Sequence, residues 1–463
     1  MTEPRKTWAA IGLAVAVSFL AWATAPRTST PDAFQERGTS FFPGFNDPRM
    51  VQSIEVVDFD EETATAHPFK VQVQNGLWTI PSEYDYPADG TERLAKTVSA
   101  IIALKKDNVA TENVSEREGT GTLDPLDETL PTLHGRGKRV TIKGDNDRVL
   151  ADVIIGNALA GRPQFRYVRL ADQARVYVAE VGDLDISSKF TDWIDSDLLH
   201  IEWNDLDQAI IQDYSLDKVT HGINVRDTLF LQKLGEDRDR VVHWTMRDLQ
   251  PGEQVDTFRA NLFNTTLSEL SIIGVRPKPP AIVAGAAQLS GTLKVSQSDL
   301  SDLGSKGFYF TAKGELVADE GALLVHTRSG LFFRLLFGDI APGDPGDITP
   351  RTAQTDSTLP TAAGSVSGPA AAIKPPATTG AKALAPETAK PPATSSVNRY
   401  LIVTASFDPT GIADGAARDA AQKRAVALQK RYAPWYYVIS GQSFEQTRLS
   451  RRVLIKSQNR KVS

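Results

Sequence analysis

Acidic residues gather at two points of the chain and are the first candidates for chemistry. The run Asp58–Glu62 (Asp-Phe-Asp-Glu-Glu) follows a strand-like segment, and Gly144–Asp147 (Gly-Asp-Asn-Asp) carries the Asp-x-Asp opening of a calcium loop. The second run lacks the central glycine and the distant glutamate that complete such a loop. Strand-like segments flank it, so turn formation accounts for its composition. We interpret the first run as the end of a strand that enters a solvated turn and the second as a turn, and we predict no metal site.

Recognised catalytic and nucleotide-binding patterns do not occur in the sequence. The chain has no cysteine, which excludes disulfides, thiolate metal sites and a cysteine nucleophile. It has no Gly-x-Ser-x-Gly elbow and no dinucleotide-binding glycine pattern. Gly156–Arg162 lacks the Lys-Ser/Thr pair of a P-loop and is interpreted as a loop after a strand. We therefore predict no catalytic residue and no cofactor, and a protein that is not an enzyme.

Histidine and tryptophan residues have structural interpretations. The six histidines show no metal-ligand spacing and are His67, His134, His200, His221, His243 and His326. Two of them, His200 and His243, lie inside strand-like patterns, where we expect hydrogen-bonded structural roles. Four tryptophans lie in apolar stretches and are expected in the core: Trp193, Trp203, Trp244 and Trp435.

Composition limits the class of protein. The chain has 463 residues, enough for two or three domains, and its hydrophobic content of 41% is ordinary for a globular protein. Its net charge of -6 provides no basic surface for nucleic acid, so no nucleic-acid partner is expected.

Strand patterns alternate with single helices after residue 50. We predict strands at 51–59, 69–73 and 76–80, followed by an amphipathic helix at 92–106. Two hairpins follow, and then a helix-like segment at 183–199. The hairpin strands are predicted at 139–143 with 149–155 and at 166–170 with 175–181.

A similar order of elements returns later in the chain. Strands at 199–203, 209–213, 228–233 and 241–246 precede a predicted helix at 255–273. A shorter version covers 293–337 and ends in a strong hairpin at 322–337. We predict an α+β fold in which units of antiparallel sheet, each covered by a helix, repeat two or three times.

Residues 341–398 interrupt this pattern, because they are rich in Pro, Ala, Thr and Ser and contain no aromatic residue. Such a composition cannot bury enough apolar surface to order itself, so we predict a disordered segment. The flanking runs 331–337 and 400–407 are strongly apolar. We therefore expect them to pair antiparallel, with 341–398 as an insertion in their loop. A helix at 417–432 and a buried strand at 435–439 complete the prediction.

The first 25 residues indicate where the protein works. Trp8–Ala25 is an uncharged run that is just long enough to span a bilayer, and Arg5 and Lys6 precede it. We expect a retained single-pass anchor with its N-terminus in the cytoplasm. The alternative is a signal peptide cleaved after Ala23 or Ala25. The absence of cysteine excludes a lipid anchor at this point.

These expectations divide the chain into an anchor, a tether and three α+β parts. The predicted boundaries are 1–25 (anchor), 26–50 (tether), 51–198 (first domain with its hairpins), 199–280 (second unit) and 281–463 (third unit, with the insertion at 341–398).

The order of several short motifs resembles the domain of unknown function 4340 family (DUF4340). The motifs are 76–80 (Gly-Leu-Trp-Thr-Ile), 153–156 (Val-Ile-Ile-Gly), 166–169 (Arg-Tyr-Val-Arg), 176–178 (Val-Tyr-Val) and 190–195 (Phe-Thr-Asp-Trp-Ile-Asp). The resemblance covers about residues 50–280 and implies an exported auxiliary protein linked to ABC-type export systems of the gliding-motility kind. It implies no catalytic residue.

The resemblance and the N-terminal segment together favour a membrane-anchored, extracytoplasmic subunit of an ABC-type transport system. Its expected partners are the membrane and a transporter permease or auxiliary subunit, and its expected location is the cytoplasmic membrane, with the C-terminal part outside the cytoplasm. The alternative is a free-standing scaffold or binding module of the cell envelope.

Overall fold

The computed structural model describes residues 36–89, 91–182, 186–217, 222–236, 242–287, 295–311, 314–342, 397–410, 412 and 415–457. The chain forms two compact units, one from residues 1–79 and 90–188 (unit 1) and one from 80–89 and 189–463 (unit 2). Both combine helices with mostly antiparallel sheets, so the mixed class of helices and antiparallel sheets that we predicted is confirmed at this coarse level. The predicted anchor and insertion lie outside the described residues, except for the ends of the insertion.

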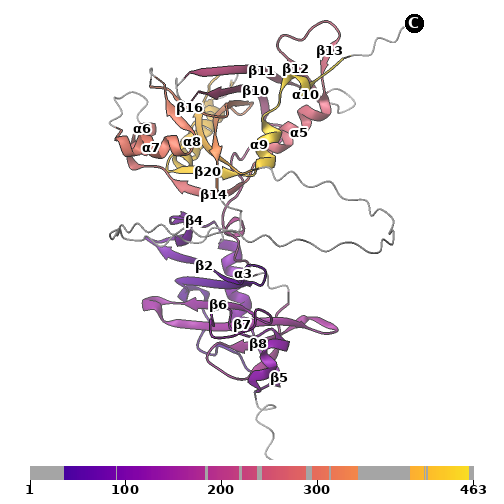
Figure 1. Cartoon of the computed structure of the whole chain (residues 1–463), viewed down its shortest axis with the longest axis vertical. Helices are drawn as coiled ribbons and strands as arrows, with labels where there is room; N and C mark the ends of the chain where they lie inside the picture. Colours follow the sequence, from indigo (N-terminus) through magenta and orange to yellow (C-terminus); the bar gives the residue numbers. More distant parts are fainter. Residues whose placement is uncertain are drawn as a thin grey trace, which may run out of the picture. The chain divides into compact units, whose positions relative to one another are not determined.

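Unit 1 is built on one antiparallel sheet with the strand order β3-β2-β1-β6-β7-β8-β9-β5. Figure 1 shows these strands with α3 beside them. Its strands and helices are β1 (Ser53–Asp60), β2 (Thr65–Gln74), β3 (Leu77–Ile80), α3 (Thr91–Ala103), β5 (Lys106–Thr111), α4 (Arg117–Thr120), β6 (Lys138–Lys143), β7 (Val149–Leu159), β8 (Arg162–Leu170) and β9 (Val176–Glu180). The predicted strands and both hairpins of this region are confirmed.

Two predictions for unit 1 need correction. Helix α3 ends at Ala103, because Lys106 begins β5 and pairs with Ala179 of β9. The last helical turn therefore carries no basic residue. The described part of the predicted tether, residues 36–50, is packed onto the unit rather than extended away from it. The rings of Phe41 and Phe45 are 5% and 2% exposed, so burial of aromatic surface holds this segment in place.

Unit 2 is built on a second sheet with the order β12-β11-β10-β17-β18-β19-β20-β14. These strands are β10 (Leu206–Leu216), β11 (Ile223–Glu236), β12 (Val242–Met246), β14 (Ile272–Pro277), β17 (Ala322–Thr327), β18 (Leu331–Ile340), β19 (Arg399–Phe407) and β20 (Trp435–Ile439). The predicted second and third units, 199–280 and 281–463, thus contribute strands to one sheet. As expected, β18 and β19 pair antiparallel on either side of the Pro-rich segment.

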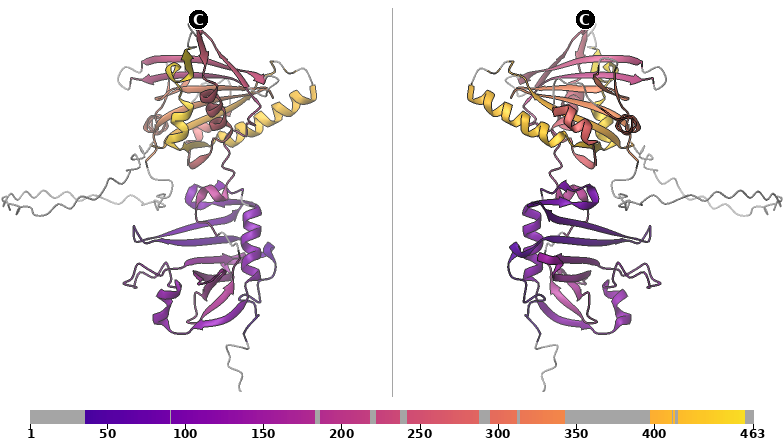
Figure 2. Two further views of the ribbon diagram at one scale, coloured as in Figure 1. Left: turned by 90° about the vertical axis from the view of Figure 1, so that its right-hand side faces the viewer. Right: turned by 90° about the vertical axis from the view of Figure 1, so that its left-hand side faces the viewer.

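The middle of the unit 2 sheet is buried on both faces. Along β19, Leu401 and Val403 alternate with Tyr400 and Ile402, and all four are buried. Tyr400 and Ile402 belong to an apolar cluster with the region of α6 (Pro280–Ala287) and α7 (Gln297–Ser305). Helix α8 (Gly415–Tyr432) packs on β18, β19 and β20. Figure 2 shows α8 as the long orange helix beside this sheet.

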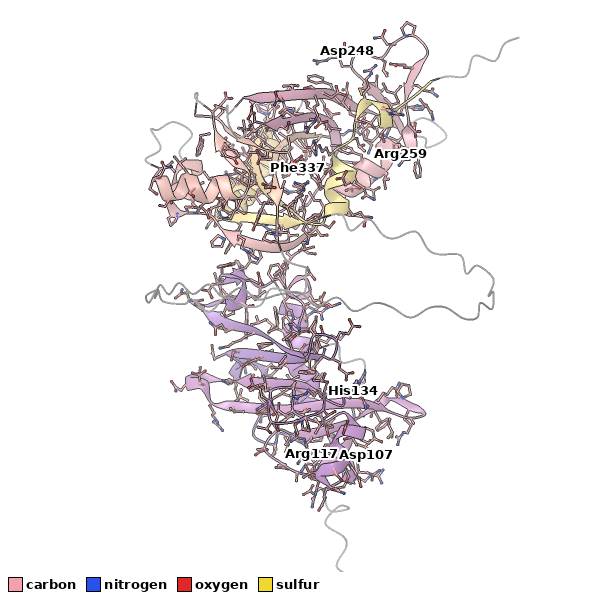
Figure 3. The ribbon with its side chains drawn as sticks, in the orientation of Figure 1. Asp107, Arg117, His134, Asp248, Arg259 and Phe337 are labelled. Atoms are coloured by element: carbon pink, nitrogen blue, oxygen red, sulfur yellow. The ribbon has the colours of Figure 1, made fainter. Side chains whose placement is uncertain are left out.

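Helices and short strands complete unit 2. They are β4 (Tyr86–Pro87), β13 (Glu253–Val255), α5 (Thr257–Ser268), α6 (Pro280–Ala287), α7 (Gln297–Ser305), β15 (Phe308–Phe310), β16 (Leu316–Ala318), α8 (Gly415–Tyr432), α9 (Gly441–Thr447), α10 (Arg451–Leu454) and β21 (Ile455–Ser457). Figure 3 places Phe337 inside this unit, where its ring centroid lies 5.4 Å from that of Phe444.

Three predictions for unit 2 are wrong. The helix expected at 255–273 ends at Ser268, because Ile272 begins β14 and pairs with Ile439 of β20. The strand expected at 199–203 is irregular, and so is most of the described part of the helix expected at 183–199. Only Phe190–Trp193 forms a short 3-10 helix there. Trp193, which we expected in the core, is nevertheless buried, at 0% exposure.

Residues 80–89 belong to unit 2 although the chain on both sides of them belongs to unit 1. The segment holds a short 3-10 helix, Pro81–Glu83, and Tyr84 and Asp85 follow it with φ angles of 57° and 59°. The side chains of Glu83 and Tyr86 are buried in unit 2, at 3% and 4% exposure. No helix in the described part of the chain is long and apolar enough to cross a membrane.

Candidate binding site

Unit 2 contains a cleft of about 530 Å³ that is open to solvent and mostly apolar in its lining. Three segments far apart in the sequence form it: residues 85–89, residue 195, and the end of α8 with the start of β20. The lining residues are Asp85, Tyr86, Pro87, Asp89, Asp195, Ala427, Lys430, Arg431, Pro434 and Trp435. We call it the Tyr86 cleft.

Aromatic packing fixes the wall of the Tyr86 cleft. The ring of Tyr86 meets Trp435 at a centroid distance of 5.0 Å and Phe190 at 5.7 Å, both in edge-to-face geometry. Such pairs contribute roughly 0.5–1.5 kcal/mol each beyond the area they bury. Tyr86 is buried, whereas Trp435 is partly exposed, so Trp435 offers ring surface to a ligand.

An ion pair joins two of these segments. One guanidinium nitrogen of Arg431 lies 2.9 Å from Oδ2 of Asp195. The other donates hydrogen bonds to the carbonyl oxygens of Asp195 and Asp197, at 2.7 and 3.0 Å. Because Arg431 lies in the last turn of α8, these bonds fix the end of that helix against residues 195–197.

His200 completes this polar cluster. Its Nε2 lies 2.8 Å from Oδ2 of Asp195 and also contacts Arg431, and Arg424 of α8 donates to its carbonyl oxygen. Its φ angle is 52°, and its backbone N–H donates to Oδ1 of Asp197 at 2.9 Å. His200 is therefore hydrogen-bonded, as expected, but it lies in a turn rather than in a strand.

The electrostatics of the cluster stabilise its charged groups. Burial alone would raise the pKa of Asp195, but the hydrogen bond with His200 and the charge of Arg431 outweigh it and lower that pKa. Burial alone would lower the pKa of Arg431, but Tyr86 and Asp195 outweigh it and raise that pKa. Burial raises the pKa of Tyr86. All three shifts move away from neutral pH, which suits binding better than proton transfer at pH 7.

Two buried groups of unit 2 titrate near neutral pH, but neither lines the cleft. Burial raises the pKa of Glu83 to about 7, although Arg276, whose Nη1 lies 3.9 Å from Oε2, opposes the shift. Burial lowers the pKa of Lys278 to about 7, and Nζ donates to the carbonyl oxygen of Tyr432 at 3.2 Å. Oε2 of Glu83 accepts no hydrogen bond within the described part of the chain.

The acidic runs singled out in the sequence lie at the end of a strand and in a turn, as predicted. Asp60 ends β1 and accepts the backbone N–H of Glu62 at 2.8 Å, and Glu61 pairs at the surface with His134 at 2.7 Å; Figure 3 labels His134. Asn146 and Asp147 have φ angles of 54° and 57° in the turn between β6 and β7. The described residues contain no group of three or more acids and histidines placed to hold a metal.

The remaining sequence candidates are structural, with two differences. Gly156 continues β7, which extends to Leu159, so the predicted loop at 156–162 is shorter than expected. Trp193 and Trp244 are buried as predicted, at 0% and 8% exposure. Trp203 and Trp435 were also expected in the core, but both are only partly buried. The Nε1 of Trp203 donates to Thr265 at 3.1 Å.

Sequence reasoning missed the Tyr86 cleft. Two signals lay nearby: the run 190–195 ends in Asp195, and the last turn of the predicted helix 417–432 contains Lys430 and Arg431. Neither signal could pair the two segments, because 236 residues separate Asp195 from Arg431.

Comparison with known families identifies part of the chain. The family model described as a domain of unknown function (DUF4340) matches residues 78–287, from β3 in unit 1 to α6 in unit 2. This confirms the family suggested by the sequence motifs. The match includes Tyr86 and Asp195, whereas Arg431 and Trp435 lie beyond it. No curated protein and no solved structure matches the chain.

Proposed function

With residues 78–287 belonging to the DUF4340 family, we propose that the chain is a non-enzymatic binding subunit anchored in the cytoplasmic membrane. Its two units work outside the cytoplasm and associate with an ABC-type transport system. The Tyr86 cleft is the binding site of unit 2.

The charge state of the cleft is the observation that carries this proposal. Asp195 and Arg431 neutralise each other, and their pKa values move away from neutral pH. An acid–base catalyst needs a group whose pKa lies near the working pH. A paired, rigidly held cluster beside exposed aromatic and proline surface instead favours recognition of a partner segment.

The membrane and transporter parts of the proposal rest on other observations. Trp8–Ala25 has the length and composition of a single membrane span preceded by basic residues. The transporter association follows from what the family resemblance implies, namely auxiliary proteins linked to ABC-type export systems.

The proposal is tested by cross-linking tagged full-length chain in native membranes, followed by affinity purification and mass spectrometry. We expect recovery of a multi-span permease or its auxiliary protein with the chain. Recovery of wall-associated proteins alone would favour a free-standing envelope module instead. The intact mass of the membrane-extracted chain tests the anchor, because a species that begins at Thr24 or Pro26 would show cleavage.

A matched pair of charge reversals tests the cleft in the same experiment. Lys430 lines the cleft and is exposed, whereas Lys423 is exposed on the same helix and does not line it. We expect Lys430→Glu to reduce recovery of the partner and Lys423→Glu to leave it unchanged. Equal recovery with both variants would place the partner contact elsewhere.

A further inference from the structure

The Tyr86 cleft carries charges of opposite sign on two of the segments that line it. Asp85 and Asp89 are exposed on one segment, and Lys430 is exposed at the end of α8. Within the described part of the chain, none of these three side chains forms an ion pair or a hydrogen bond. The other charged residues of the lining, Asp195 and Arg431, pair with each other. The charges that remain for a ligand are therefore two carboxylates and one ammonium group.

The acidic segment is held in place by its own backbone and by Tyr86. The backbone N–H of Asp89 donates to the carbonyl oxygen of Trp193 at 3.0 Å, and that of Asp85 donates to the carbonyl oxygen of Ile80 at 3.1 Å. Between these two bonds, Tyr86 is only 4% exposed. The two carboxylates therefore project from a backbone that is fixed before any ligand binds, which reduces the entropy cost of binding.

The helix end that carries Lys430 is fixed as well. Lys430 lies in the last turn of α8, next to Arg431. The guanidinium group of Arg431 donates to the carbonyl oxygens of Asp195 and Asp197, and the same helix packs on β18, β19 and β20. The fold thus sets the point from which the ammonium group projects, and only the lysine side chain itself has to order when a ligand binds.

The rest of the lining is mostly apolar. Trp435 and Pro434 are partly exposed, and Pro87 and Ala427 are exposed. The cleft holds about 530 Å³ and is open to solvent. An open cleft of this kind suits an extended segment, whose ends continue into solvent, better than a small molecule that it would have to enclose.

A segment with charges of both signs complements this lining best. A purely acidic segment would be repelled by Asp85 and Asp89, and a purely basic one by Lys430. A basic residue and an acidic residue on either side of a short apolar stretch match both charges and also cover the apolar lining. Arginine is the most suitable basic residue, because its planar guanidinium group donates two hydrogen bonds to a carboxylate and also packs on aromatic rings.

We propose that the Tyr86 cleft binds an extended segment of a partner protein in which an arginine and an acidic residue flank a short apolar stretch. The arginine binds Asp85 and Asp89, the acidic residue binds Lys430, and the apolar stretch packs on Trp435. The inference rests on the proposed binding role of the cleft and adds the chemistry of the partner segment to it. It also explains why Lys430→Glu should reduce recovery of the partner, because that change places two carboxylates against each other.

Synthetic peptides test the proposal without the partner protein. The first is Arg-Leu-Pro-Leu-Glu, acetylated and amidated at its ends, and three further peptides carry Gln in place of Arg, of Glu, or of both. Each is titrated into purified full-length chain at low salt by isothermal titration calorimetry. The series is repeated with one and with two apolar residues between the charged positions, so that the spacing is tested as well. We expect the best peptide with both charges to bind about tenfold more tightly than its uncharged version.

Variants of the chain assign each charge of the peptide to one side of the cleft. Asp85→Asn combined with Asp89→Asn should weaken binding of the peptides that contain arginine about threefold and leave the other peptides unchanged. Lys430→Met should do the same for the peptides that contain glutamate. The matched controls are Asp419→Asn and Lys423→Met, because both residues are exposed on α8 and neither lines the cleft. The control variants should bind every peptide as the parent chain does.

Equal affinities for the charged and uncharged peptides, or no binding of any peptide at millimolar concentration, would overturn the proposal. A charge preference that the cleft variants do not change would also overturn it, because the peptides would then bind elsewhere. Since the titration uses the purified chain alone, its failure is distinguishable from a failure to recover a permease from native membranes.

Discussion

Arg431 holds Asp195 at 2.9 Å across a separation of 236 residues. The pair joins the last turn of α8 to the segment that follows the short helix Phe190–Trp193. Arg431 also donates to the backbone carbonyl oxygens of Asp195 and Asp197. One side chain therefore provides hydrogen bonds to carbonyls that lie outside the helices and named strands. The geometry of the Tyr86 cleft depends on this contact, because Asp195 and Arg431 both line it.

Replacing Arg431 should therefore destabilise unit 2. Arg431→Met keeps most of the aliphatic stem, but it removes the donor of two backbone carbonyls and leaves the Asp195 carboxylate with His200 as its remaining partner in this cluster. The side chain of Arg431 is 21% exposed, so we expect a loss of about 2–4 kcal/mol in the free energy of unfolding. Denaturant unfolding of the purified chain measures it.

The matched control for this variant is Arg49→Met. Arg49 also pairs with an aspartate, Asp47 at 3.1 Å, but its side chain is 91% exposed. Solvent screens such an exposed pair, so we expect Arg49→Met to change the stability much less than Arg431→Met does. Similar losses for the two variants would show that the Arg431 contact contributes no more than a surface pair.

Glu83 should make the stability of unit 2 fall as the pH rises from about 4 to 7. Burial raises its pKa to about 7 in the folded chain, whereas an unfolded glutamate titrates near ~4.3. The folded state then binds more protons in this window, so raising the pH favours unfolding. We expect Glu83→Gln to raise the melting temperature at pH 8 and to change it little at pH 4.

The exposed Glu445 of α9 provides the control for this pH dependence. The difference in melting temperature between Glu445→Gln and the parent chain should stay nearly constant between pH 4 and pH 8. A Glu83→Gln chain whose melting curve follows that of the parent at every pH would show that Glu83 titrates normally.

Lys278 should make the stability of unit 2 rise with pH, and in a higher pH range than the one in which Glu83 acts. Burial lowers its pKa to about 7, whereas an unfolded lysine titrates near ~10.4. The folded state binds fewer protons between these values, so stability should rise with pH from about 7 to about 10. Lys278→Met should remove this rise, and Lys423→Met, at an exposed position, should preserve it. Melting temperatures at pH 7 and pH 10 measure both effects.

Local sequence patterns predicted the elements whose own residues strongly favour one conformation. The hairpin of β17 and β18 and the strand Trp435–Ile439 are confirmed, and α8 begins at Gly415 rather than at the predicted residue 417. Runs of β-branched and aromatic residues, or of alanine with charged residues, specify these elements by themselves.

Predictions failed where distant contacts decide the conformation. The helix predicted through residue 273 ends earlier, because Ile272 pairs with Ile439. The strand predicted at 199–203 is irregular, and the Asp197 side chain accepts the N–H of His200 there. The cleft depends on the same kind of long-range pairing, so composition and periodicity give it no local signature.

Gly156, the glycine of the Val-Ile-Ile-Gly motif in β7, lies close to the backbone of residues 120–121. A Cβ atom at this position would lie 2.3 Å from the carbonyl oxygen of Thr120 and 2.7 Å from that of Gly121. Both contacts are with backbone, which cannot rotate away as a side chain can. Gly156→Ala should therefore force β7 and the 120–121 segment apart and cost about 2 kcal/mol or more.

Gly44→Ala is the control in the same unit, because a Cβ there would meet no atom within 4 Å. This variant should keep or slightly raise the melting temperature, since alanine restricts the unfolded chain more than glycine does. If Gly156→Ala unfolded at the same temperature as Gly44→Ala, the close approach of the two backbones would not be what requires glycine in this motif.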